Sequence, residues 1–210
     1  MSKVLKDIKE NEFKQESTSD SVKQFITEIF KIVITALIIV IPVRYYVIQP
    51  FYVKGESMEH TYKNGDYLII NEIGYRFGEP VRGDVVVLRP PNDPSDFYIK
   101  RIIGLPGERI QIKDGFVYIL DENNNSTKLS ETYLSDDVIT SDAVFTKDPV
   151  ITLGDDEYLV LGDNREHSTD SRIFGPVKRS ALVGKTMLRA WPVSRFELIK
   201  NPLVYPLANN

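Results

Sequence analysis

The sequence predicts a mainly β domain that follows a single N-terminal membrane-spanning helix. From residue 47 onward, short runs of β-branched and aromatic residues alternate with Gly, Pro, Asn and Asp, which is the pattern of strands and turns. Before these runs lies one long apolar segment, residues 22–43. The residues in front of that segment are polar and mixed in charge, so they cannot bury enough apolar surface to fold on their own.

The segment 22–43 is long enough to cross a membrane. Its uninterrupted apolar part, residues 32–43, is shorter than the ~20 residues of a span, but the whole segment reaches that length. Glu28 and Lys31, three residues apart on one helical face, can pair. A cleaved signal peptide would need a small-residue cleavage site, and bulky aromatic residues follow instead. A buried core helix is the other alternative.

The distribution of lysine indicates the orientation of this span. Six lysines precede the apolar run, whereas only Arg44 and Lys54 follow it closely. The positive-inside rule therefore places the N-terminus in the cytoplasm and the rest of the chain outside the cell membrane. We expect a flexible cytoplasmic tail over residues 1–21, a single transmembrane helix over 22–43 and an extracytoplasmic region over 44–210.

Residues 110–155 have the character of a β-rich subdomain inserted into that outer region. A Lys-Asp-Gly turn at 113–115 separates two strand-like runs, as in a hairpin. The stretch that follows, residues 129–156, is polar and weakly patterned, which favours an insertion over a core element.

Composition argues against several classes of function. The net charge is −4 and no basic stripe is present, so no nucleic-acid partner is expected. The chain has no cysteine, which excludes disulfides, a cysteine nucleophile and thiolate metal sites. With only His60 and His167, a zinc site built mainly from histidine is not expected either, and we expect neither a metal nor an organic cofactor.

A lysine in an apolar strand is the most unusual local feature. Strand alternation over residues 98–103 puts Lys100 on one face and Arg101 on the other, so either could point inward. An inward lysine is costly unless it is paired or neutral, and a neutral amine is a competent general base. Ser57, by contrast, would by itself be taken for an ordinary turn residue.

Four segments in this order resemble the bacterial type I signal peptidases, membrane-anchored serine proteases that release exported proteins from their signal peptides. The compact length and single anchor resemble the Gram-positive form. The resemblance runs from the N-terminal anchor to about Val177. The four segments are residues 52–62, 82–89, 98–108 and 161–177. The motifs in them that carry the resemblance are Ser-Met at 57–58, Lys100 followed by Arg-Ile-Ile-Gly-Leu-Pro-Gly-Glu, Gly-Asp-Asn-Arg at 162–165, and Ser-x-Asp-Ser-Arg at 168–172.

The resemblance implies a catalytic region over 44–210 with a coiled or barrel-like β-sheet and a smaller β extension. It implies that Ser57 is the nucleophile and that neutral Lys100 is the general base. Ser168 should hydrogen-bond to the Lys100 amine, with an Asp170–Arg172 ion pair behind it. The backbone N–H of Ser57 should provide one oxyanion-hole donor.

The resemblance also implies a substrate cleft and a cellular partner. Secreted preproteins would bind in extended form along strand edges near 51–53 and 98–100, with membrane lipid as the second partner. Shallow apolar pockets would favour small side chains, in an Ala-x-Ala pattern, before the cut. The residues at the matching positions are Phe51, Val53, Met58, Tyr98 and Ile99.

One stretch departs from the family pattern. His60 and Tyr62 stand where the family usually has proline and leucine, and Tyr62 could reshape a pocket. An inactive, membrane-tethered scaffold protein is therefore the main alternative function. His60 or His167 could also serve as base in a Ser-His-Asp arrangement, although Lys100 already has a base's surroundings. Self-cleaving repressors share a Ser–Lys pair, but residues 1–46 show no DNA-binding domain.

Overall fold

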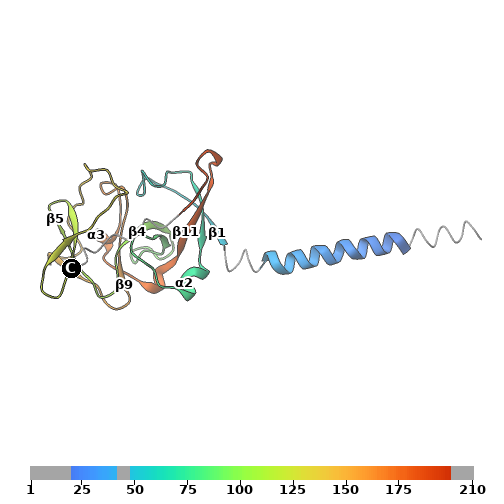
Figure 1. Cartoon of the computed structure of the whole chain (residues 1–210), viewed down its shortest axis with the longest axis horizontal. Helices are drawn as coiled ribbons and strands as arrows, with labels where there is room; N and C mark the ends of the chain where they lie inside the picture. The colour runs from blue at the N-terminus through green and yellow to red at the C-terminus, as the bar shows by residue number, and fades with distance from the viewer. Residues whose placement is uncertain (1–19, 42–47, 200–210) are drawn as a thin grey trace, which may run out of the picture. The chain divides into compact units, whose positions relative to one another are not determined.

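The computed structural model describes residues 20–41 and 48–199, which form two separate units, a helix and a β domain (Figure 1). The predicted tail lies outside the described residues except for Asp20 and Ser21, and so do the last two residues of the predicted span.

The first unit is the helix Asp20–Ile41, which has 22 residues. At 1.5 Å per residue it is about 33 Å long, enough to cross a hydrocarbon core of about 30 Å. All its residues are exposed, as those of a helix in a soluble core would not be. The predicted pair is present, because Lys31 Nζ lies 3.1 Å from Glu28 Oε1. Length and composition are thus those of a membrane span.

The main sheet of the β domain has eight strands in the order β1-β2-β11-β3-β4-β9-β10, with β12 paired to β11, and every neighbouring pair is antiparallel. Register shifts along β11 mark irregularities that bend and twist the sheet into a coiled form. The predicted mainly β fold is confirmed. The strands are β1 (Ile48–Tyr52), β2 (Tyr67–Asn71), β3 (Val85–Leu88), β4 (Tyr98–Gly104), β9 (Glu157–Leu161), β10 (Val177–Lys178), β11 (Leu182–Trp191) and β12 (Glu197–Leu198).

A second, four-stranded sheet has the order β7-β6-β5-β8 and lies at one end of the β domain, marked by β5 in Figure 1. The predicted hairpin turn is present, since Asp114 and Gly115 both have positive φ, at 51° and 83°. Two such residues make the tight turn whose twist matches a hairpin. The strands are β5 (Arg109–Lys113), β6 (Phe116–Leu120), β7 (Ser126–Lys128) and β8 (Val150–Thr152).

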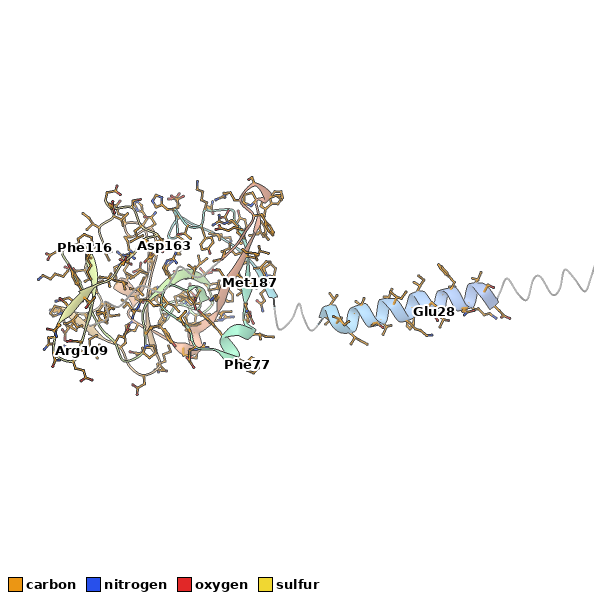
Figure 2. The ribbon with its side chains drawn as sticks, in the orientation of Figure 1. Glu28, Phe77, Arg109, Phe116, Asp163 and Met187 are labelled. Atoms are coloured by element: carbon orange, nitrogen blue, oxygen red, sulfur yellow. The ribbon has the colours of Figure 1, made fainter. Side chains whose placement is uncertain are left out.

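Short helices connect the strands. They are α2 (Ile73–Phe77), α3 (Ser171–Phe174) and the 3-10 turns η1 (Arg179–Ala181) and η2 (Val193–Arg195). Phe77, at the end of α2, is 88% exposed and projects from the domain (Figure 2).

Three apolar clusters form the core. One lies in and beside the second sheet, and one lies around β3, β4 and β9. The third supports the loop between β1 and β2 and consists of Val53, Met58, Tyr62, Leu68 and Val85. This third cluster gives the loop that carries Ser57 an apolar foundation.

Candidate active site

The loop between β1 and β2 holds Ser57 at the surface of the third cluster. The loop is closed at its base, because Val53 N donates to Asp66 O and Gly65 N donates to Val53 O, at 2.9 and 3.0 Å. Within it, Tyr62 N donates to Met58 O at 2.8 Å. These bonds fix the backbone on both sides of Ser57, which itself stays half-buried.

Ser57 and Lys100 are brought into direct contact. Lys100 Nζ lies 2.8 Å from Ser57 Oγ and 3.1 Å from the carbonyl oxygen of Ile99. The lysine is only 3% exposed. β4 supplies the lysine and the β1–β2 loop supplies the serine, so two distant parts of the sequence meet at this point.

The surroundings of Lys100 lower the pKa of its amine to about 8. Burial is the main cause, since it disfavours the charged form, and Arg172 acts in the same direction. Asp170 and Asp163 oppose the shift. With this pKa, about a tenth of the lysine is neutral at pH 7, far more than for an ordinary lysine.

Asp170 and Arg172 form the predicted buried ion pair. Asp170 caps α3, and its carboxylate accepts from Arg172 Nε at 2.8 Å and from the other guanidinium arm at 2.7 Å. It also accepts from Gly162 N at 3.0 Å. Burial alone would raise the pKa of Asp170, but these bonds hold it below its ordinary value.

Ser168 lies beside the pair without the predicted bond to Lys100. Its hydroxyl is buried next to the Asp170 carboxylate and helps to lower that pKa, yet Oγ meets no hydrogen-bond geometry with any described residue. The hydroxyl is close to the nucleophile loop, because a Cβ added at Gly162 would lie 2.2 Å from Ser168 Oγ and 2.4 Å from Ser57 O.

A second buried ion pair lies on the other face of β4. Arg101 donates to both carboxylate oxygens of Asp163, at 2.8 and 2.5 Å, and Thr61 Oγ1 donates to the same carboxylate at 2.5 Å. Asp163, labelled in Figure 2, is 1% exposed. This pair ties the loop after β9 to the nucleophile loop. The sequence analysis assigned no site role to Arg101 or Thr61, although it left open that the side chain of Arg101 points inward.

A cleft of about 460 Å³ opens beside Ser57. Of the five predicted pocket residues, Phe51, Val53, Tyr98 and Ile99 line it, whereas Met58 does not. Met58 is 1% exposed because it packs into the third cluster beneath the loop. The sequence analysis assigned no pocket role to several further lining residues: Leu68, Val87, Phe97, His167 and Thr169.

Two strand edges border this cleft. Among the described strands, β1 lies outermost in its sheet and pairs only with β2. Residues 98–100 of β4 pair with β3 on one side, whereas pairing with β9 on the other side begins only at Arg101. Strand edges of this kind can bind an extended peptide by main-chain hydrogen bonds.

The two residues that depart from the family pattern lie apart from the cleft lining. His60 is exposed and has a φ of 79°, a left-handed conformation. Tyr62 is 1% exposed, and its hydroxyl lies 3.1 Å from Thr186 Oγ1. Tyr62 therefore packs in the core and does not shape the cleft beside Ser57.

Acidic and histidine side chains do not gather into a metal-binding group here. Within residues 20–41 and 48–199, no cluster of three or more His, Cys, Asp or Glu residues has the spacing to hold an ion.

A serine hydroxyl bonded to a buried lysine amine, at the edge of a peptide-sized cleft, is an arrangement typical of a serine peptidase. A family model described as signal peptidase, peptidase S26, matches residues 26–191. The chain therefore belongs to the signal peptidase S26 family. Membership makes it a signal peptidase I, whose substrates are preproteins with signal peptides.

Two relatives compared by sequence agree with this assignment. A probable signal peptidase I-2 from Synechocystis sp. is 40% identical over 177 residues, which cover 82% of this chain and 76% of that protein. Signal peptidase IB from Staphylococcus aureus is 38% identical over 181 residues, covering 80% and 90%. A solved signal peptidase I from Enterococcus faecalis is 34% identical, with a TM-score of 0.42, over 51% of this chain and 96% of that one.

Proposed function

We propose that Ser57 is the nucleophile of this signal peptidase and Lys100 its general base. The observation that carries the proposal is the 2.8 Å separation of Lys100 Nζ and Ser57 Oγ. The lowered pKa of the buried amine supports it, because only the neutral amine can accept a proton. The reaction needs a hydrolytic water and no cofactor.

The chemistry proceeds in two halves. Lys100 Nζ takes the hydroxyl proton while Ser57 Oγ bonds to the scissile carbonyl carbon, and the Ser57 N–H donates to the oxyanion. Collapse breaks the C–N bond, and the ammonium of Lys100 returns its proton to the leaving amine. Lys100 then deprotonates a water that attacks the acyl-enzyme. As the ester C–O bond breaks, the ammonium of Lys100 returns this proton to Ser57 Oγ, which releases the signal peptide and restores both residues.

The cleft supports recognition of an extended peptide with small side chains. The outer edge of β1 and the unpaired edge of residues 98–100 are available for main-chain hydrogen bonds. The rings of Phe51 and Phe97 meet edge to face at 5.2 Å between centroids and narrow the cleft. We infer that alanine-sized residues, one and three positions before the cut, fit this space.

The location of the reaction follows from the helix. Six lysines precede the apolar run and only Arg44 and Lys54 follow it closely, which supports a cytoplasmic N-terminus and a catalytic domain on the outer side of the cell membrane. A chain of sixteen residues links Ile41 to Ser57 and extends at most about 55 Å. Ser57 is therefore within reach of the membrane surface at which signal peptides emerge.

Cleavage of a preprotein by the full chain in detergent or lipid tests this function. We expect cleavage after an Ala-x-Ala site, and its loss in Ser57→Ala and Lys100→Ala. Lys63→Ala, which removes an exposed lysine from the same loop, is the matched control and should cleave normally. Absence of cleavage together with no labelling of Ser57 by an acylating lipopeptide or β-lactam would favour the scaffold alternative.

A further inference from the structure

The segment Glu131–Thr140, here called the clamp segment, contacts both the second sheet and the loop after β9. It lies between β7 and β8 and forms no strand. Thr140 N donates to Gly115 O at 2.9 Å, which fastens the segment to the hairpin turn of β5 and β6. Leu134 N donates to Glu131 O at 2.9 Å and folds its start into a turn.

Glu131 pairs with a fully buried arginine outside the clamp segment. The side chain of Arg165 is 0% exposed and that of Glu131 is 10% exposed. Arg165 donates to both carboxylate oxygens of Glu131 and to the hydroxyls of Thr140 and Tyr133. A buried charge that loses its partner is strongly destabilising, so the position of Arg165 depends on the clamp segment.

Arg165 in turn holds the loop Gly162–Ser168, here called the catalytic loop. Its Nε donates to Gly162 O at 3.1 Å. Tyr133 reaches the same loop by a second route, because its ring lies 3.9 Å beneath the guanidinium carbon of Arg101, which binds Asp163. The clamp segment thus supports two successive residues of the catalytic loop through two arginines.

The catalytic loop contacts the backbone of the loop that carries Ser57. Asn164 N donates to Ser57 O at 3.1 Å, and Asn164 Nδ2 donates to Glu56 O at 3.1 Å. The loop also leaves no room at Gly162, where a Cβ would meet Ser57 O. A shift of this loop would therefore move the backbone of the nucleophile and open the buried surroundings of Lys100.

We propose that the clamp segment positions the catalytic loop against Ser57 and Lys100, with Glu131 and Tyr133 as its positioning residues. Neither side chain touches the cleft, so both act through Arg165 and Arg101. This role rests on the proposed function of Ser57 and Lys100. It gives the second sheet a part in catalysis, since the sheet anchors the clamp segment.

Three substitutions separate the two routes. Glu131→Gln keeps the shape of the side chain and removes its charge; Tyr133→Leu removes the ring beneath Arg101; Tyr133→Phe keeps that ring. We expect Glu131→Gln and Tyr133→Leu to lower kcat by about 10-fold or more with KM changed less than about twofold, because small misplacements of reacting groups cost rate. Tyr133→Phe should stay within about threefold of the native kcat.

The pH dependence of kcat distinguishes a positioning role of the clamp segment from a purely structural one. The charged groups that face Lys100 are Asp170, Asp163 and Arg172, and burial is the main influence on its pKa. A loosened catalytic loop admits water, so the pKa of Lys100 should rise toward its ordinary value. The acid limb of kcat should therefore move upward by at least about half a pH unit in Glu131→Gln and Tyr133→Leu.

The control is Ile119→Val, a change of one methylene in the apolar cluster against which Tyr133 packs, which removes none of the polar contacts of the clamp segment. It should lower thermal stability and leave kcat and the acid limb as in the native chain. All measurements use the full chain in detergent with one Ala-x-Ala peptide. The proposal fails if Glu131→Gln and Tyr133→Leu match the native profile, or if Ile119→Val shifts it equally. Activity in Lys100→Ala would instead overturn the dyad itself.

Discussion

Lys100 and Arg101 are neighbours on β4 and both are 3% exposed, but their charged groups have different surroundings. Arg101 donates to the carboxylate of Asp163 at 2.8 Å, whereas the amine of Lys100 donates to the neutral oxygens of Ser57 and Ile99. The arginine is a compensated buried charge. Among the described residues no carboxylate pairs directly with the lysine, and burial shifts the equilibrium of its amine toward the neutral form.

The rate of cleavage should follow the titration of Lys100. Because the pKa is lowered to about 8, kcat/KM of the full chain should rise about tenfold per pH unit below pH 8 and level off above it. The measurement is a pH–rate profile on a non-titrating Ala-x-Ala peptide. A midpoint near 6.5, the ordinary value for histidine, would contradict the assignment and point to His60 or His167.

Replacing Lys100 with methionine should stabilise the fold while abolishing cleavage. Below pH 8 the native chain buries a charged amine, and methionine removes that cost, which is about 1.4 kcal/mol per unit of pKa shift. Between pH 8 and the ordinary lysine value of 10.5, the unfolded chain binds more protons than the folded one, so native stability rises with pH. The gain from methionine should shrink across this window.

Urea unfolding of the native chain and of Lys100→Met at pH 7 and pH 10 checks this expectation. A gain that is equal at both pH values would show that the folded-state pKa of Lys100 is not lowered.

Gly162 should tolerate no side chain. A Cβ there would lie 2.2 Å from Ser168 Oγ and 2.4 Å from Ser57 O, and the second of these atoms is backbone that cannot turn away. Gly162→Ala should therefore displace the nucleophile loop and lower kcat/KM by more than about 100-fold. Gly154→Ala is the control, since its nearest neighbour is the end of the Glu157 side chain at 3.3 Å. Equal activity in the two variants would refute this reading of Gly162.

Local patterns predicted the elements of this fold better than their order. The apolar helix, the strand-rich region and the Lys-Asp-Gly hairpin each depend on neighbouring residues, and all three are present. The insertion of β11 between β2 and β3 depends on pairing between residues that lie roughly a hundred positions apart in the sequence. Nothing in the alternation of β11 itself specifies those partners.

The site shows the same division. The motif resemblance predicted the contact between Ser57 and Lys100. It also predicted Met58 as a residue of the cleft, whereas Met58 is buried in the core. Phe97 was missed because its place beside Phe51 results from the curvature of the sheet. The support of the catalytic loop by Glu131 was missed as well, since a polar, weakly patterned stretch gives no sign of a long-range partner.

The left-handed backbone conformation at His60 should exclude proline from this position. Its φ of 79° is accessible to glycine, whereas proline is fixed near −65°. His60→Pro, the residue usual in the family, should therefore destabilise the domain by at least about 1 kcal/mol, and His60→Gly should stay within about 1 kcal/mol of the native stability. Thermal unfolding measures both. His60→Gly should also cleave normally, and loss of cleavage there would support a histidine base.

Tyr62 should contribute to stability and not to the choice of cleavage site. Its ring is buried in the third cluster and its hydroxyl lies 3.1 Å from Thr186 Oγ1. Tyr62→Phe should cost about 1 kcal/mol for that contact, and Tyr62→Leu about 2–4 kcal/mol because it also leaves a cavity. Chemical denaturation measures both losses. Because Tyr62 does not line the cleft, Tyr62→Leu should retain the native preference between Ala-x-Ala and Leu-x-Ala peptides, whereas a shift toward leucine would place Tyr62 in a substrate pocket.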